Sequence, residues 1–106
     1  MWVVSGREIR MTEGDYGVTL PIAISGVTLG AGDSILFTLK KEFYRDTVFT
    51  VEFTNITDNT VNLNLTSAQS EALTVGNYIY NLDWYQSGTF MCNLVNGASF
   101  KVVAKN

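Results

Sequence analysis

The 106-residue sequence contains no histidine and a single cysteine, Cys92. Without histidine, the chain lacks the usual general base for a serine or cysteine nucleophile, and one cysteine cannot form an internal disulfide. The sequence also has no GxxxxGK[ST] or GxGxxG phosphate-binding motif and no EF-hand calcium loop. These absences predict a protein that is not an enzyme and that binds no metal or cofactor.

Charged side chains are also scarce, at 16% of the sequence compared with about 25% in an average soluble domain. The net charge is −3, and the basic cluster of Lys40, Lys41 and Arg45 is too small for the stripe typical of a nucleic-acid-binding protein. No apolar run approaches the ~20 residues of a membrane-spanning helix. We therefore expect no nucleic-acid or membrane partner, and we expect another protein to cover part of this weakly charged surface.

The first residues, MWVVSGREIRM, do not show the basic segment followed by a long apolar run that defines a signal peptide. Secreted domains of this size often contain disulfides, which this chain cannot form within itself. Both observations favour folding in a reducing cytoplasm.

Short runs of alternating apolar and polar residues fill the chain, and glycine, asparagine and aspartate separate them about every ten residues. This pattern is typical of an all-β sandwich or barrel. The length predicts a single domain over residues 1–106, in which residues 1–7 form an N-terminal extension. Seven or eight antiparallel strands are expected: 8–12, 18–25, 34–40, 48–53, 60–65, 77–85, 89–95 and 98–103.

Turn chemistry predicts how these strands connect. Three turns should each join the strand before them to the strand after them as a hairpin: Asp58-Asn59, Gln86-Ser87-Gly88 and Asn96-Gly97. Asn96-Gly97 is the strongest of these signals, because it suits a type I′ turn. The single proline, Pro21, cannot donate to a strand ladder, so the strand 18–25 is expected at a sheet edge or with a bulge.

The same alternation predicts the core. Its largest side chains lie on one face of the strand 77–85, at Tyr78, Tyr80, Leu82 and Trp84. The other strands are expected to contribute Val18, Leu20, Ile22, Ile24, Ile35, Phe37, Leu39, Phe49, Val51, Phe53, Val61, Leu63, Leu65, Phe90, Cys92, Leu94, Phe100 and Val102.

One short helix is expected over residues 66–73. Thr66 and Gln69 form a T-x-x-Q capping box at its start. Gly76 is expected at positive φ to end it. The helix would cross between the strands 60–65 and 77–85.

Candidate binding residues are the apolar or aromatic side chains that the alternation leaves outside the core. The N-terminal Trp2, Val3 and Val4 are too short to order alone and should pack against a sheet edge of this domain or of a neighbour. Tyr44 and Tyr85 lie at turns. We interpret these five residues as an interaction surface. Exposed tyrosines also keep a carbohydrate-binding module open as an alternative.

Four stretches together resemble a family of phage structural domains. They are EGDYGVTLPIAI, SILFTLK, VNLNLTSAQSEAL and LTVGNYIYNLDWYQSGTFMCNLVNGASFKVV. The resemblance covers about Ile9 to Val103 and concerns the hydrophobic skeleton, with motifs of the type "hydrophobic-x-F-T-hydrophobic-K" and "L-x-x-G-x-Y-x-Y-x-L". The family comprises immunoglobulin-like β-sandwiches found at the N-terminus of baseplate upper proteins and as small stand-alone virion or prophage proteins.

The resemblance implies an immunoglobulin-like sandwich with no catalytic residues. It implies a structural protein of a phage or prophage tail or baseplate, located in the virion and, during assembly, in the cytoplasm of the bacterial host. Other virion or tail proteins would be its partners, and a second copy of the chain could be one of them. The alternative function is a carbohydrate-binding module that recognises a cell-surface glycan.

Overall fold

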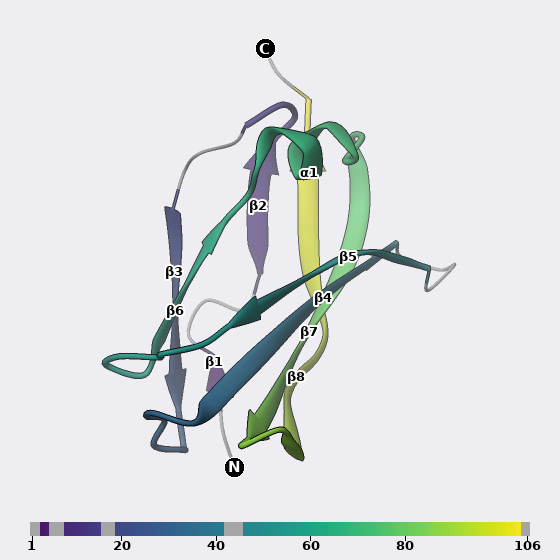
Figure 1. Ribbon diagram of the computed structural model, residues 1–106. Helices are drawn as coiled ribbons and strands as arrows, with labels where there is room; N and C mark the ends of the chain where they lie inside the picture. Colours follow the sequence, from purple (N-terminus) through teal and green to yellow (C-terminus); the bar gives the residue numbers. More distant parts are fainter. Residues whose placement is uncertain (1–2, 5–7, 16–18, 42–45, 105–106) are drawn as a thin grey trace.

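The computed structural model describes residues 3–4, 8–15, 19–41 and 46–104. Within these residues the chain forms eight strands and one short helix, which confirms the all-β prediction (Figure 1). The elements are β1 (Val3–Val4), β2 (Ile9–Thr12), β3 (Thr19–Ser25), β4 (Asp33–Lys41), β5 (Thr47–Phe53), β6 (Thr60–Asn64), α1 (Ser67–Glu71), β7 (Gly76–Gln86) and β8 (Thr89–Val103).

The strands form a five-stranded sheet, in the order β2-β8-β7-β4-β5, and a three-stranded sheet, in the order β1-β3-β6 (Figure 1). Most neighbours are antiparallel, but β2 runs parallel to β8, with Ile9 opposite Phe100. The prediction that all strands are antiparallel is therefore wrong at this edge. Since β2 and β8 come from opposite ends of the chain, no short turn constrains them to be antiparallel.

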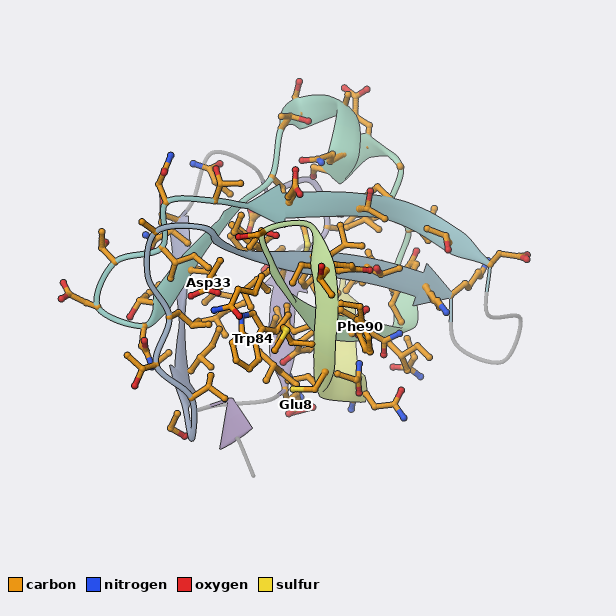
Figure 2. All side chains as sticks on the ribbon, turned by 60° about the horizontal axis from the view of Figure 1, so that its bottom comes forward. Glu8, Asp33, Trp84 and Phe90 are labelled. Atoms are coloured by element: carbon orange, nitrogen blue, oxygen red, sulfur yellow. The ribbon has the colours of Figure 1, made fainter. Side chains whose placement is uncertain are left out.

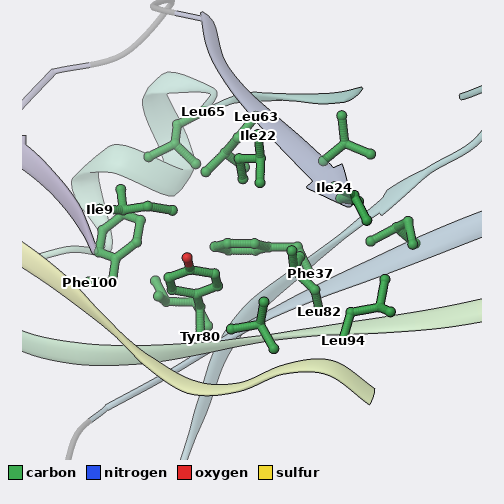
Figure 3. Packing of buried hydrophobic residues seen from close by; sticks show 14 of the residues in the cluster. Ile9, Ile22, Ile24, Phe37, Leu63, Leu65, Tyr80, Leu82, Leu94 and Phe100 are labelled. Atoms are coloured by element: carbon green, nitrogen blue, oxygen red, sulfur yellow. The ribbon is translucent and has the colours of Figure 1, made fainter. Parts of the chain in front are cut away.

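The core lies between the two sheets (Figure 3). Ile35, Phe37 and Leu39 of β4 are completely buried, as their alternation predicts. Phe37 stacks on Tyr80 of β7 with ring centroids 5.4 Å apart. The three-stranded sheet covers them with Ile22, Ile24, Val61 and Leu63. The predicted core is therefore confirmed at these positions. Trp84 of β7 and Phe49, Val51 and Phe53 of β5 pack against it but are only partly buried, and Val18 lies outside the described residues.

Leu20 departs from the core prediction, because 38% of it remains exposed. It borders a small apolar pocket together with Ile9 and Leu63, so its side chain is covered on one side only. The strand that contains Pro21 was predicted at a sheet edge or with a bulge, but β3 is the middle strand of its sheet and pairs regularly with β6, so that prediction is wrong for the strand as a whole. Pro21 itself is tolerated because β1 does not reach it. On one side of β3 it lies opposite Asn62 of β6, and β1 pairs on the other side only with Ile24 and Ser25.

The predicted hairpin between β5 and β6 does not form. β5 pairs with β4 in one sheet, and β6 pairs with β3 in the other. A tight turn does form at Asp58 and Asn59, which both have positive φ, and Thr60 N–H donates to Thr57 C=O at 3.0 Å. This turn redirects the chain into β6 after the crossing, so the turn signal was right and the strand pairing inferred from it was wrong.

Helix α1 connects the two sheets, as the predicted crossover requires. Gln69 N–H donates to Thr66 Oγ1 at 3.1 Å, and Thr66 N–H donates to Gln69 Oε1 at 2.9 Å, which confirms the capping box. The C-cap is Ala72. Gly76 has the expected positive φ of 155°, but it begins β7 and does not terminate the helix.

The hairpin predicted at Asn96-Gly97 is also absent, because β8 is one strand of 15 residues. Its pairing with the 11-residue β7 contains three register shifts, so β8 carries extra residues opposite β7. One shift lies where Asn81 of β7 faces Asn96 and Gly97, and Gly97 N–H donates to Asn81 Oδ1 at 2.7 Å. Gly97, at φ +68°, therefore forms a β-bulge, a use of positive-φ glycine distinct from a turn.

The bulge makes Gly97 a position where any other residue is strained. A Cβ at Gly97 would meet no atom within 4 Å, so the cost of Gly97→Ala is conformational, about 1–2 kcal/mol of unfolding free energy. Gly30→Ala is the control, because its Cβ also enters open space and its φ lies outside the left-handed region. Urea unfolding should show a loss for the first variant and none for the second. Equal midpoints would contradict the bulge.

Candidate functional site

The structure places the five predicted surface residues unequally. Trp2 and Tyr44 lie outside the described residues. Val3 and Val4 form β1, whose backbone pairs antiparallel with Ser25 and Ile24 of β3, so the domain's own sheet receives this segment. Tyr85 lies near the end of β7 and is half-buried.

Tyr85 belongs to an apolar surface at the end of the β7–β8 hairpin. It lies opposite Phe90, and the two rings meet edge to face with centroids 5.7 Å apart and an interplanar angle of 71°. Phe90 is 53% exposed and Met91 is 43% exposed. We call Tyr85, Phe90 and Met91 the hairpin patch.

Phe90 was predicted in the core, and a register shift explains why it is not. The pairing moves by one residue between Trp84 and Tyr85 of β7, which leaves Met91 as the extra residue on β8. Cys92, beyond the shift, stays opposite Trp84 and packs against the core. Phe90 lies on the other side of the shift, directly opposite Tyr85, and therefore points to the same outward face of the sheet.

The turn contained a signal that could have identified Phe90. Ser87 and Gly88 have φ of +49° and +83°, as a two-residue type I′ turn requires. Such a loop fixes Gln86 opposite Thr89 and therefore Tyr85 opposite Phe90, which is the register observed. Counting residues outward from the turn assigns Phe90 to the correct, outward face of the sheet. Extending the apolar alternation back from Leu94 assigns it wrongly to the core.

A set of hydrogen bonds braces this end of the hairpin. Asp33 is buried, and its carboxylate accepts from Trp84 Nε1–H at 3.1 Å and from Gly30 N–H at 2.8 Å (Figure 2). Ser87 N–H donates to Gly32 C=O at 2.8 Å. The hairpin is thereby tied to the loop before β4, so the patch residues are presented on a fixed backbone.

The hairpin patch is also uncharged. Between Asn81 and Val95 the only charged residue is Asp83, and its carboxylate accepts from Asn93 Nδ2 at 2.7 Å. Exposed aromatic and methionine side chains fit an apolar protein surface.

The structure also contains a small pocket between β2 and the three-stranded sheet. Its volume is about 140 Å³, below the roughly 300–1,000 Å³ of usual small-molecule sites. Its lining is mainly apolar, from Ile9, Met11, Leu20, Leu63, Leu65 and Phe100, with Arg10 and Asp15. A pocket of this size and lining is better suited to one apolar side chain than to a sugar or a cofactor.

Within the described ranges, no three acidic, cysteine or histidine side chains come together as a metal site would require. The helix there is also too short to cross a membrane. A scan against protein-family models finds no match for this chain, and a search of curated proteins finds no relative. Function is therefore inferred from the surface and from the strand pattern.

Proposed function

We propose that this chain is a structural protein of a phage or prophage virion, a tail or baseplate component that binds another virion protein through the hairpin patch. The observation that carries the interaction is the exposure of Phe90 and Met91 on a braced hairpin. Aromatic residues and methionine are enriched at protein interfaces, where they fill apolar recesses of the partner. The partner surface is correspondingly apolar and weakly charged.

The virion assignment is supported by the hydrophobic skeleton that resembles the phage family. The repeated tyrosines of the second motif lie in β7, the central strand of the five-stranded sheet, and the stretch SILFTLK lies in β4 beside it. The proposal includes an immunoglobulin-like sandwich, which two sheets around one core support. In this arrangement the family motifs build the scaffold and leave the hairpin end to make contacts.

Carbohydrate binding is less well supported by the same residues. A sugar-binding face presents its aromatic rings flat, whereas Tyr85 and Phe90 meet at 71° and share no plane. Tyr85 is also half-buried beneath this contact. A protein partner that packs around Phe90 accommodates this geometry better.

The proposed contact predicts that the double variant Phe90→Ser, Met91→Ser binds tail particles more weakly without unfolding. Removal of an anchoring aromatic residue costs about 2 kcal/mol or more, which is roughly a 30-fold rise in Kd. Co-sedimentation of purified protein with tail particles from the strain that carries the gene measures this. Val75→Ser is the matched control, because Val75 is 50% exposed but lies between α1 and β7.

Two results would reject the proposal. One is that antibodies against the chain label no virion or tail particle from that strain by immunogold microscopy. The other is that a glycan array shows tight binding that Tyr85→Ala abolishes, which would favour the carbohydrate-binding module.

A further inference from the structure

Strand β5 forms one edge of the five-stranded sheet. Of the strands the structure describes, only β4 pairs with it, and all seven of its residues are half-buried or exposed. Its sequence, TVFTVEF, is rich in β-branched and aromatic residues and contains no proline or lysine. An edge strand of this kind is a template for pairing with another strand.

The other edges are less suitable. β2 has four residues, β6 has five and β1 has two. β5 is the longest edge strand, and its register against β4 is regular from Phe49 to Phe53. Of the described edge strands, β5 therefore offers the longest backbone for pairing with a further strand.

We propose that β5 pairs antiparallel with β5 of a second copy of this chain, about a two-fold axis through Thr50. The two sheets then form one continuous sheet of ten strands. This inference is independent of the virion proposal, because it uses only the sheet edge. The hairpin patch lies on β7 and β8, with β4 between it and β5, so the pairing leaves it free.

The side-chain pattern of β5 suits this symmetry. Directly opposed residues in an antiparallel pair point to the same face. With Thr50 on the axis, Phe49 lies opposite Val51 of the second copy. Val48, the extra residue of a bulge against β4, lies beside its Glu52. The half-buried Phe49 and Val51 thus gain cover on the core side of the sheet, and the segment from Phe49 to Val51 pairs regularly with its copy.

Charge favours this register over the two adjacent registers, with the axis through Phe49 or through Val51, which also place core-facing side chains opposite one another. An axis through Phe49 would set Asp46 opposite Glu52 of the second copy, which is a like-charge pair. An axis through Val51 would leave Thr47 and Val48 beyond the paired strands and bring the two Glu52 carboxylates closer. The axis through Thr50 avoids both costs.

A charge swap on the axis tests the proposal. Thr50 is exposed, so Thr50→Lys and Thr50→Glu should each fold, but each puts two like charges opposite one another in the dimer. Size-exclusion chromatography with light scattering should show a dimer for the natural sequence, a monomer for each variant alone, and a dimer again for their equimolar mixture. Asn62→Lys, which adds the same charge to the exposed edge of β6, should remain dimeric.

Disulfide trapping tests the register in a Cys92→Ala background. Opposed residues have Cα atoms about 4.5–5.5 Å apart, so Thr50→Cys should form a dimer on a non-reducing gel. Glu52→Cys should not, because the two sites lie about 13 Å apart along the strands. A monomeric natural protein, a dimer that ignores both Thr50 charge variants, or equal crosslinking at the two positions would overturn the proposal.

Discussion

Replacing Tyr80 with alanine should lower the free energy of unfolding by about 3–5 kcal/mol. Tyr80 is completely buried in the middle of β7, and its ring stacks on Phe37. Truncation removes this stack and leaves a cavity that the flanking Leu39 and Ala98, fixed by the sheet, cannot fill. Because a domain of this size has about 5–15 kcal/mol of stability in total, the variant should be close to unfolding at 37 °C.

Tyr85→Ala is the matched control for Tyr80→Ala. It removes the same side chain from the same strand, but on the outward face, where the ring contacts Phe90 edge to face. A contact of this kind contributes about 0.5–1.5 kcal/mol. Urea denaturation followed by tryptophan fluorescence measures both losses. Equal losses in the two variants would contradict the assignment of the two faces of β7.

The sequence predicts the central strands well because their alternation is uninterrupted. β4 and β7 pair over nine residues without a register shift, so each apolar residue at period two reaches the core. The helix was also predictable, because its capping box is a local signal between Thr66 and Gln69. In these segments local pattern and tertiary environment agree.

Prediction fails where the structure depends on extra residues in one strand. After each bulge in β8, the residues that point inward and outward change by one position. The apolar pattern of the sequence does not indicate where such a change occurs. Leu94 and Val95 are both buried for this reason, although they are adjacent. Phe90 is exposed for the same reason, which is why the main residue of the hairpin patch was assigned to the core.

Strand pairing between distant segments was also not predictable from local signals. The Asp58-Asn59 turn was recognised correctly, but nothing in it specifies whether β6 joins β5 or β3. Of the candidate surface, Tyr85 was found from its place beside a turn, and β1 was found from its apolar residues at an edge. The β5 edge became visible only when the order of strands in the sheet was known.

Asn59 shows how one turn residue can fix the end of a strand and the loop that follows it. Its Oδ1 accepts from Leu29 N–H at 2.8 Å, and its Nδ2 donates to Ile24 C=O at 3.1 Å and to Val27 C=O. Its own carbonyl accepts from Ile24 N–H at 2.8 Å. The side chain thus satisfies three backbone groups at the end of β3 and in the loop after it, which lie 30 to 35 residues earlier in the sequence.

Asn59→Ala should therefore lower the free energy of unfolding by about 2–4 kcal/mol, since it removes three hydrogen bonds to partly buried backbone groups. Alanine at φ +51° adds a conformational cost, which Asn55→Ala controls because Asn55 has φ +52° and is exposed. The control should lose only about 1–2 kcal/mol. Hydrogen exchange at the Leu29 amide should accelerate in Asn59→Ala alone. Equal losses of stability, with unchanged exchange at Leu29, would show that the Asn59 side chain does not hold this loop.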